Sequence, residues 1–182
     1  MFTKPGYKNT AQALEIMLQG VEEYGVKEVV VASTYGDTAL EAAKMLQNKD
    51  VKLVVVTHNY GFKKPGSHEM TLETRKQLEQ GGAVVYTGTM PFRNIGTSIR
   101  EKQSYSQQDL VANTLRMLGQ GIKVCVEIVL MAADSGNIGN DDVLAVAGTG
   151  RGADTVALIE PQSSNRLFQI KIKNILAKPL DW

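Results

Sequence analysis

Short apolar runs alternate with amphipathic stretches along most of this chain. Continuous β-branched or apolar runs lie at residues 29–32, 51–57, 83–86 and 143–147, which is typical of strands that are covered on both faces. Apolar residues recur at helical spacing between the early runs and also before the first of them. This order predicts an α/β fold with a mostly parallel sheet, right-handed crossovers and helices on both faces.

The last part of the chain predicts two more strands. Residues 155–159 form another apolar run. Residues 167–173 alternate, with Phe168, Ile170 and Ile172 on one face and polar residues on the other. Such alternation indicates a strand with one buried face, so we expect an antiparallel strand at one edge of the sheet.

Composition narrows the class of protein. The chain has 182 residues, 43% of them hydrophobic and 21% charged, so we expect a single domain over residues 1–182. A formal net charge of +1 gives no overall basic field for nucleic acid, and no apolar run is long enough for a membrane span. The single cysteine, Cys125, and the absence of a signal-peptide pattern predict a cytoplasmic protein.

A glycine-rich loop follows the apolar run at 143–147. Gly148, Gly150 and Gly152 surround Thr149 and Arg151. Glycines allow close approach of the backbone to a ligand, and arginine offers a fork of donors to an anion. The segment therefore predicts a phosphate cradle, although a glycine-rich turn between two strands explains it equally well.

A second candidate loop follows the first strand. Ser33, Thr34, Gly36, Asp37 and Thr38 lie between that strand and a predicted helix, whose first amides are free to hold an anion. Asp37 or Thr38 could instead simply cap the helix. Asp37 also counts against a phosphate placed directly on the helix end, and it could accept hydrogen bonds from ligand hydroxyls.

His58 and Phe62 follow the second long strand, at the end of the sheet where open α/β folds bind their ligands. His58 could act as a general base or a ligand contact, or it could be an ordinary polar surface residue. No other histidine or cysteine lies near enough in the sequence to predict a metal site.

Residues 121–136 predict a mostly buried helix with one polar stripe. Lys123, Glu127 and Asp134 fall within a narrow arc at 100° per residue, and nearly every other position is apolar. The stripe could be an i,i+4 ion pair that reaches solvent, or it could face the site and bring an ammonium and a carboxylate to the ligand. A buried strand over 123–130 is the less favoured alternative.

The longest irregular connection is predicted at residues 87–105. It contains Met90, Phe92, Arg93 and Arg100. A connection of this length inside a domain is commonly a lid, a partner surface or a disordered piece, and the apolar residues argue against disorder.

Two segments carry a resemblance to a known family: residues 31–39, VASTYGDTA, and residues 147–155, AGTGRGADT. With the element order, they resemble the C-terminal domain of pyruvate kinases. The chain more closely resembles stand-alone bacterial and archaeal proteins that share this fold, and residues 121–128, GIKVCVEI, add to that likeness.

The resemblance implies a three-layer α/β/α sandwich whose five-stranded sheet has the order 3-2-1-4-5, with the last strand antiparallel. It places the two loops side by side. In pyruvate kinases these loops hold the phosphates of a sugar-bisphosphate effector, whereas the pocket of the stand-alone proteins suits flavin mononucleotide (FMN). The chain lacks the barrel domain, which excludes the pyruvate kinase reaction, and Tyr35 and Asp37 depart from the effector-binding pattern.

We therefore expect a binding or sensing protein for a phosphorylated small molecule, with FMN as the cofactor that the resemblance suggests. The alternative is an enzyme that uses Lys123, Glu127 or His58 for proton transfer in the same pocket. Self-association of the chain stays open. The residues expected to hold the ligand are Ser33, Thr34, Gly36, Asp37, Thr38, His58, Phe62, Gly148, Thr149, Gly150, Arg151, Gly152, Asp154 and Thr155.

Overall fold

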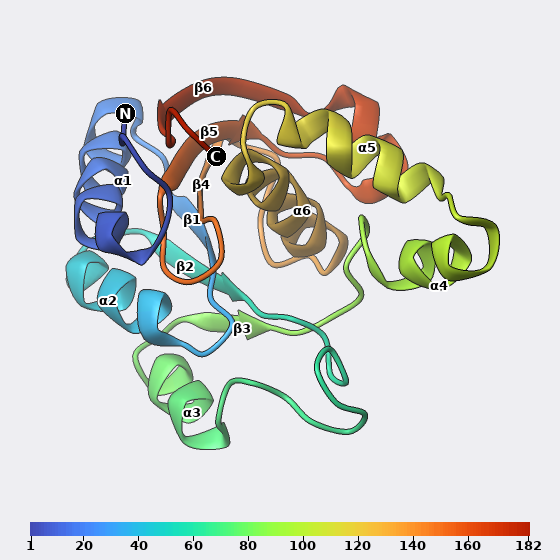
Figure 1. Ribbon diagram of the computed structural model, residues 1–182. Coiled ribbons are helices and arrows are strands. Elements are labelled where there is room, and N and C mark those ends of the chain that lie inside the picture. The colour runs from blue at the N-terminus through green and yellow to red at the C-terminus, as the bar shows by residue number, and fades with distance from the viewer.

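Six strands form one sheet in the order β3-β2-β1-β4-β5-β6 in the computed structural model, which describes residues 1–182 (Figure 1). The first four strands pair in parallel, whereas β5 and β6 are antiparallel to their neighbours. The predicted order 3-2-1-4-5 is confirmed, and a sixth strand extends it. The strands are β1 (Glu28–Ala32), β2 (Lys52–Val56), β3 (Val84–Tyr86), β4 (Val143–Ala147), β5 (Thr155–Glu160) and β6 (Lys171–Ala177).

Helices cover both faces of this sheet, as the three-layer prediction requires. One face packs against α1 (Thr10–Tyr24), α2 (Asp37–Leu46) and α3 (Leu72–Gln80). The other face packs mainly against α6 (Gln120–Asp134), with α5 (Gln107–Arg116) on α6 and α4 (Asn94–Gln103) beyond it (Figure 1). Two 3₁₀ helices, η1 (Tyr7–Asn9) and η2 (Ser164–Gln169), complete the chain.

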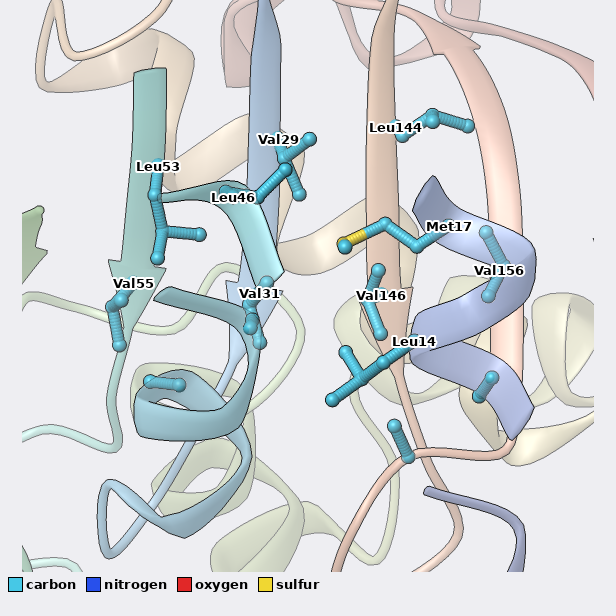
Figure 2. Close-up of a cluster of buried hydrophobic side chains, with 14 of the residues drawn as sticks. Leu14, Met17, Val29, Val31, Leu46, Leu53, Val55, Leu144, Val146 and Val156 are labelled. Carbon is cyan, nitrogen blue, oxygen red and sulfur yellow. The ribbon is translucent and has the colours of Figure 1, made fainter. Parts of the chain in front are cut away.

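The strands are continuously apolar because both faces of the sheet are buried. Successive side chains of β1 point to opposite faces: Val29 and Val31 join the core under α1 and α2, and Val30 joins the core under α6. Leu14 and Met17 of α1 pack on the first face, as Figure 2 shows. Apolar contact on both sides explains why the strand runs do not alternate in sequence.

The most apolar helix, α6, was correctly predicted as a helix rather than a strand. It has 15 residues, and its buried side chains include Cys125, which is fully enclosed. Burial raises the pKa of the Cys125 thiol, which makes it a small apolar residue in practice. No helix, α6 included, combines the length and apolar character that crossing a bilayer requires.

Two predictions of local structure were wrong. Residues 87–105 are not irregular throughout, because α4 occupies Asn94–Gln103. The alternation at 167–173 does not form a strand over its whole length, because Ser164–Gln169 is a 3₁₀ helix and Phe168 is 91% exposed. Pairing with β5 decides the start of β6, since Glu160 aligns with Lys171 and Ile159 with Ile172.

We expect Leu14→Ala to lower the free energy of unfolding by about 2–5 kcal/mol, because Leu14 is 1% exposed in the core under α1. Leu72→Ala is the matched control, since Leu72 begins α3 and is 69% exposed. Urea denaturation should show a change of less than about 0.5 kcal/mol for the control. Equal losses in both variants would contradict the assignment of the core.

Candidate functional site

A cavity of about 490 Å³ lies at the carboxyl ends of β1, β2 and β4. The chain proceeds from β1 to β2 and β3 on one side and returns to β4 on the other side of β1, so this is the switch point of the sheet. The sequence-predicted site residues that line the cavity are Ser33, Thr34, Asp37, Thr38, His58, Phe62, Lys123, Glu127, Gly148, Gly150, Arg151 and Gly152. Gly36, Thr149, Asp154 and Thr155 do not line it.

The glycines of the loop after β4 are required mainly by packing within the protein. A Cβ at Gly148 would lie 2.4 Å from the carbonyl oxygen of Gly152. A Cβ at Gly152, where φ is +76°, would lie 2.3 Å from Oγ1 of Thr10 and 2.6 Å from Cα of Tyr7. Only Gly150 has open space around it, with a φ of +84°, so it is the part of the loop that a ligand can approach closely.

Asp154 anchors this glycine-rich loop through hydrogen bonds. Its side chain is fully buried, and Oδ2 accepts hydrogen bonds from the backbone N–H of Gly6 at 2.9 Å and of Thr149 at 3.0 Å. The hydroxyl of Thr155 donates to Oδ1 at 2.8 Å. Asp154 and Thr155 therefore tie the N-terminal segment to the glycine-rich loop and shape the cavity without contacting its interior.

The loop after β1 meets the glycine-rich loop across the mouth of the cavity. Arg151 forms an ion pair with Asp37, and its guanidinium lies 4.7 Å from the ring centre of Tyr35. Both partners of the ion pair are 65% exposed, so the pair contributes little stability and can exchange partners. At the same helix end, Ser33 Oγ accepts from the N–H of Ala39 at 3.2 Å, so neither Asp37 nor Thr38 is needed as a cap.

His58 and Phe62 form a stacked pair in the cavity wall, with ring centres 3.8 Å apart. The guanidinium of Arg93 lies over the ring of Phe62, 4.5 Å from its centre. Burial lowers the pKa of His58, Glu69 and Glu127 raise it less, and Arg93 and His68 lower it further. Nε2 of His58 is 3.4 Å from Oγ1 of Thr34, whereas Nδ1 is buried without a hydrogen-bond partner.

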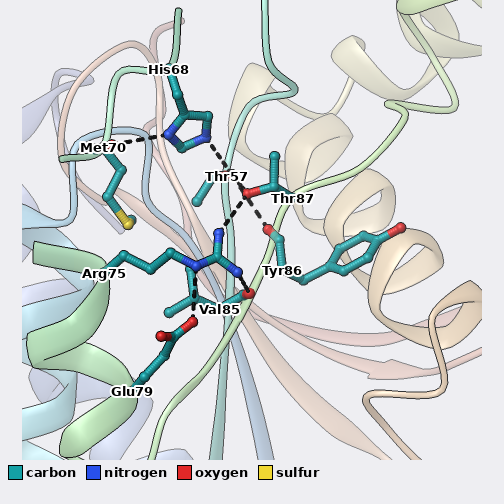
Figure 3. A network of polar contacts seen from close by, with 8 residues as sticks. All are labelled: Thr57, His68, Met70, Arg75, Glu79, Val85, Tyr86 and Thr87. Carbon is teal, nitrogen blue, oxygen red and sulfur yellow. Dashed lines mark hydrogen bonds and ion pairs between the residues drawn. The ribbon is translucent and has the colours of Figure 1, made fainter. Parts of the chain in front are cut away.

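The segment that carries His58 and Phe62 is anchored by a polar network around His68, whose Nε2 is also 3.1 Å from the carbonyl oxygen of His58; Figure 3 shows the rest of this network. His68 Nε2 is 3.1 Å from Oγ1 of Thr57, and Nδ1 is 3.1 Å from the carbonyl oxygen of Met70. Thr57 also bonds to Thr87, which accepts from Arg75 of α3 at 3.2 Å. This network joins the ends of β2 and β3 to α3 and so positions the His58–Phe62 pair.

Lys123 and Glu127 form a buried ion pair on the cavity wall, with side chains 5% and 2% exposed. Oε1 of Glu127 also accepts from the N–H of Phe92 at 2.9 Å. Burial lowers the pKa of Lys123, and Glu127 opposes this shift. The two alternatives for the polar stripe thus combine: the residues do pair at i,i+4, but the pair faces the cavity rather than solvent.

One face of α6 supplies much of the wall. The lining residues recur at helical spacing, and besides the ion pair they include Gln120, Val124, Ile128 and Met131. Met90 adds to this apolar part from the connection before α4.

Sequence reasoning missed several cations of the wall, namely Lys63, Arg93 and Arg116. Arg116 donates to Oε1 of Gln120 at 2.7 Å and to Oδ1 of Asn113 at 2.8 Å. The sequence signal for Arg93 is its place in the long connection at residues 87–105, and the signal for Arg116 is its place at a helix end four residues before Gln120. No group of three or more His, Cys, Asp or Glu side chains is placed to hold a metal ion.

No protein-family model matches the chain. The chain is similar to two solved structures of a pyruvate kinase from Cryptosporidium parvum, one of them in complex with ADP, with 16% sequence identity over 87% of this chain and TM-scores of 0.43 and 0.44. The match covers 24% and 25% of those chains, so this chain spans about a quarter of their length.

We expect Gly152→Ala to destabilise the protein by about 2 kcal/mol or more, since the positive φ and the contact with Tyr7 both oppose a Cβ. Gly150→Ala shares the positive φ but meets no atom within 4 Å, so it should cost about 1 kcal/mol. Urea denaturation measures both values. Equal costs would show that the N-terminal segment does not pack against the loop.

His58 should titrate below its ordinary pKa of 6.5 because burial disfavours the charged ring. As the pH falls through 6.5, the unfolded chain takes up this proton before the folded protein does, so folding stability decreases until the lower folded pKa is reached. NMR titration of the imidazole resonances measures the midpoint, with His58→Asn identifying the signal. A midpoint above 6.5 would overturn this expectation.

Proposed function

We propose that the cavity at the switch point binds a phosphorylated small molecule, and that FMN is the ligand that best suits it. The observation that carries this proposal is the make-up of the wall: five cationic side chains and two carboxylates surround a space of about 490 Å³ that is also partly apolar. This volume falls within the range of small-molecule sites, about 300–1,000 Å³. The excess of positive charge favours an anionic ligand.

The phosphate end of the ligand belongs at the two loops. The first amides of α2 and the backbone around Gly150 offer donors at the cavity mouth. Arg151 can exchange the exposed carboxylate of Asp37 for a phosphate. Asp37 is then free to accept hydrogen bonds from ligand hydroxyls, as a ribityl chain provides.

The ring end of the ligand belongs at the apolar wall. Val124, Ile128 and Met131 of α6 and Met90 form a surface for a flat aromatic system. The unpartnered Nδ1 of His58 offers a buried polar contact to such a ring. The residues therefore fit FMN, which supplies one- and two-electron redox chemistry when it is bound.

A second candidate function is catalysis in the same cavity. The Lys123–Glu127 ion pair favours it, because a buried ion pair in a cavity wall is weak evidence for stability and a candidate for a functional role. In that case Lys123 would donate or Glu127 accept a proton at the ligand. Glu127→Gln keeps the size of the side chain and its bond to Phe92, so loss of a turnover with ligand affinity kept would favour catalysis.

Binding is tested by mixing the purified protein with FMN, removing free ligand by gel filtration and recording the visible spectrum. We expect the wild-type protein to retain one flavin per chain. Arg151→Gln should raise the dissociation constant for FMN about tenfold. Lys44→Gln is the matched control, since Lys44 is an exposed cation near the far end of α2. A colourless protein, or equal affinities in both variants and wild type, would contradict the FMN site.

A further inference from the structure

A second cavity adjoins the first. It has a volume of about 310 Å³ and lies between α4, α5 and α6. Arg93, Arg116 and Lys123 line both cavities. We call this second space the α4–α6 pocket; the three shared cations form its boundary with the first cavity.

The shared arginines have no acidic partner. Neither Arg93 nor Arg116 forms an ion pair, since Arg116 donates only to neutral amide oxygens and Arg93 stacks over Phe62. The only carboxylate in the wall of the α4–α6 pocket is Asp109. Asp109 is already occupied, because it accepts from Arg100 at 3.1 Å and from the hydroxyl of Ser106 at 2.9 Å.

Lys123 adds a third positive charge at this boundary. It is 4% exposed, its carboxylate partner Glu127 also binds the N–H of Phe92, and Arg116 and Arg93 both lower its pKa. Three cations that face one another with one carboxylate among them repel each other unless an anion joins them.

The opposite end of the sheet shows that this imbalance is local. The cavity at the amino ends of the strands contains more charged residues than the α4–α6 pocket, but its lysines are paired with carboxylates. Lys27 pairs with Asp50, Lys52 with Glu28, and Lys173 with Asp142 and Glu160. The lack of such partners at Arg93 and Arg116 therefore distinguishes the α4–α6 pocket.

We propose that Arg93, Arg116 and Lys123 form a subsite for a small carboxylate or phosphate anion, separate from the glycine-rich loop. Two guanidinium groups provide the forked donors that these planar or tetrahedral anions accept. The hydroxyls of Thr97 and Tyr105 in the same wall offer further polar contacts. The subsite lies beside the ligand of the first cavity, and its existence does not depend on that ligand being FMN.

The anion can belong to a second small molecule or to the distal end of the ligand in the first cavity. The experiment titrates the protein with malonate and, separately, with inorganic phosphate at constant ionic strength in chloride, followed by calorimetry. Wild type, Arg93→Gln and Arg116→Gln are compared with two controls. Lys44→Gln removes an exposed cation of α2 and Lys102→Gln an exposed cation of α4, and neither residue lies in either cavity.

We expect at least one of the two anions to bind wild type and both controls with the same affinity. The same anion should bind Arg93→Gln and Arg116→Gln about tenfold more weakly. Arg116→Lys keeps the positive charge but lacks the forked guanidinium donors, so it should recover part of the affinity. Such a recovery would show that the loss in Arg116→Gln is not caused by misfolding. The proposal is overturned if neither anion binds wild type, if Arg93→Gln and Arg116→Gln bind as tightly as wild type, or if Lys44→Gln or Lys102→Gln weakens binding as much as Arg116→Gln does.

Repeating the malonate titration with saturating FMN identifies the source of the anion. Unchanged malonate affinity assigns the subsite to a second molecule. Competition, together with weaker FMN binding in Arg93→Gln and Arg116→Gln, assigns it to the anionic end of the first-cavity ligand. The first titrations contain no FMN, so a failure of the FMN proposal leaves their result intact.

Discussion

The parallel pairing of β1 with β2 on one side and β4 on the other decides where the switch-point cavity of this protein lies. Val29, Val30 and Val31 are fully buried and align with residues of both neighbouring strands. Because α2 and α3 cover one face and α6 the other, the chain separates at the carboxyl ends of β1 and β4. The cavity at that point follows from the topology, and its chemistry depends on the loops that happen to meet there.

Those loops are shaped by contacts within the protein as much as by any ligand. Asp154 accepts from the N–H groups of Gly6 and Thr149, and the hydroxyl oxygen of Thr10 accepts from the N–H of Ala153 at 3.0 Å. The N-terminal segment thus stabilises the glycine-rich loop from outside. A loop that is held in this way presents its open glycine, Gly150, without first having to be ordered, which favours binding.

The distribution of charge differs between the mouth of the cavity and its inner side. Arg151 and Asp37 neutralise each other at the exposed mouth, whereas Arg93 and Arg116 have no acidic partner at the inner side, beside the buried Lys123–Glu127 pair. Lys123 and Glu127 are buried, whereas Arg93 is exposed and Arg116 is half-buried. Arg93 and Arg116 can meet an anion without breaking an ion pair, whereas Arg151 must first leave Asp37.

The sequence by itself determined the α/β class, the positions of the first five strands and the two loops, because β-branched runs, helical spacing and clustered glycines are local signals. It also predicted the polar stripe of Lys123 and Glu127, since positions four apart on a helix share a face. Only the tertiary structure decided that Asp154 supports the loop, that β6 starts at Lys171, and that Arg93 meets Arg116 and Lys123. Each of these depends on side chains or strands that are distant in the chain and come together only when the sheet and its helices pack.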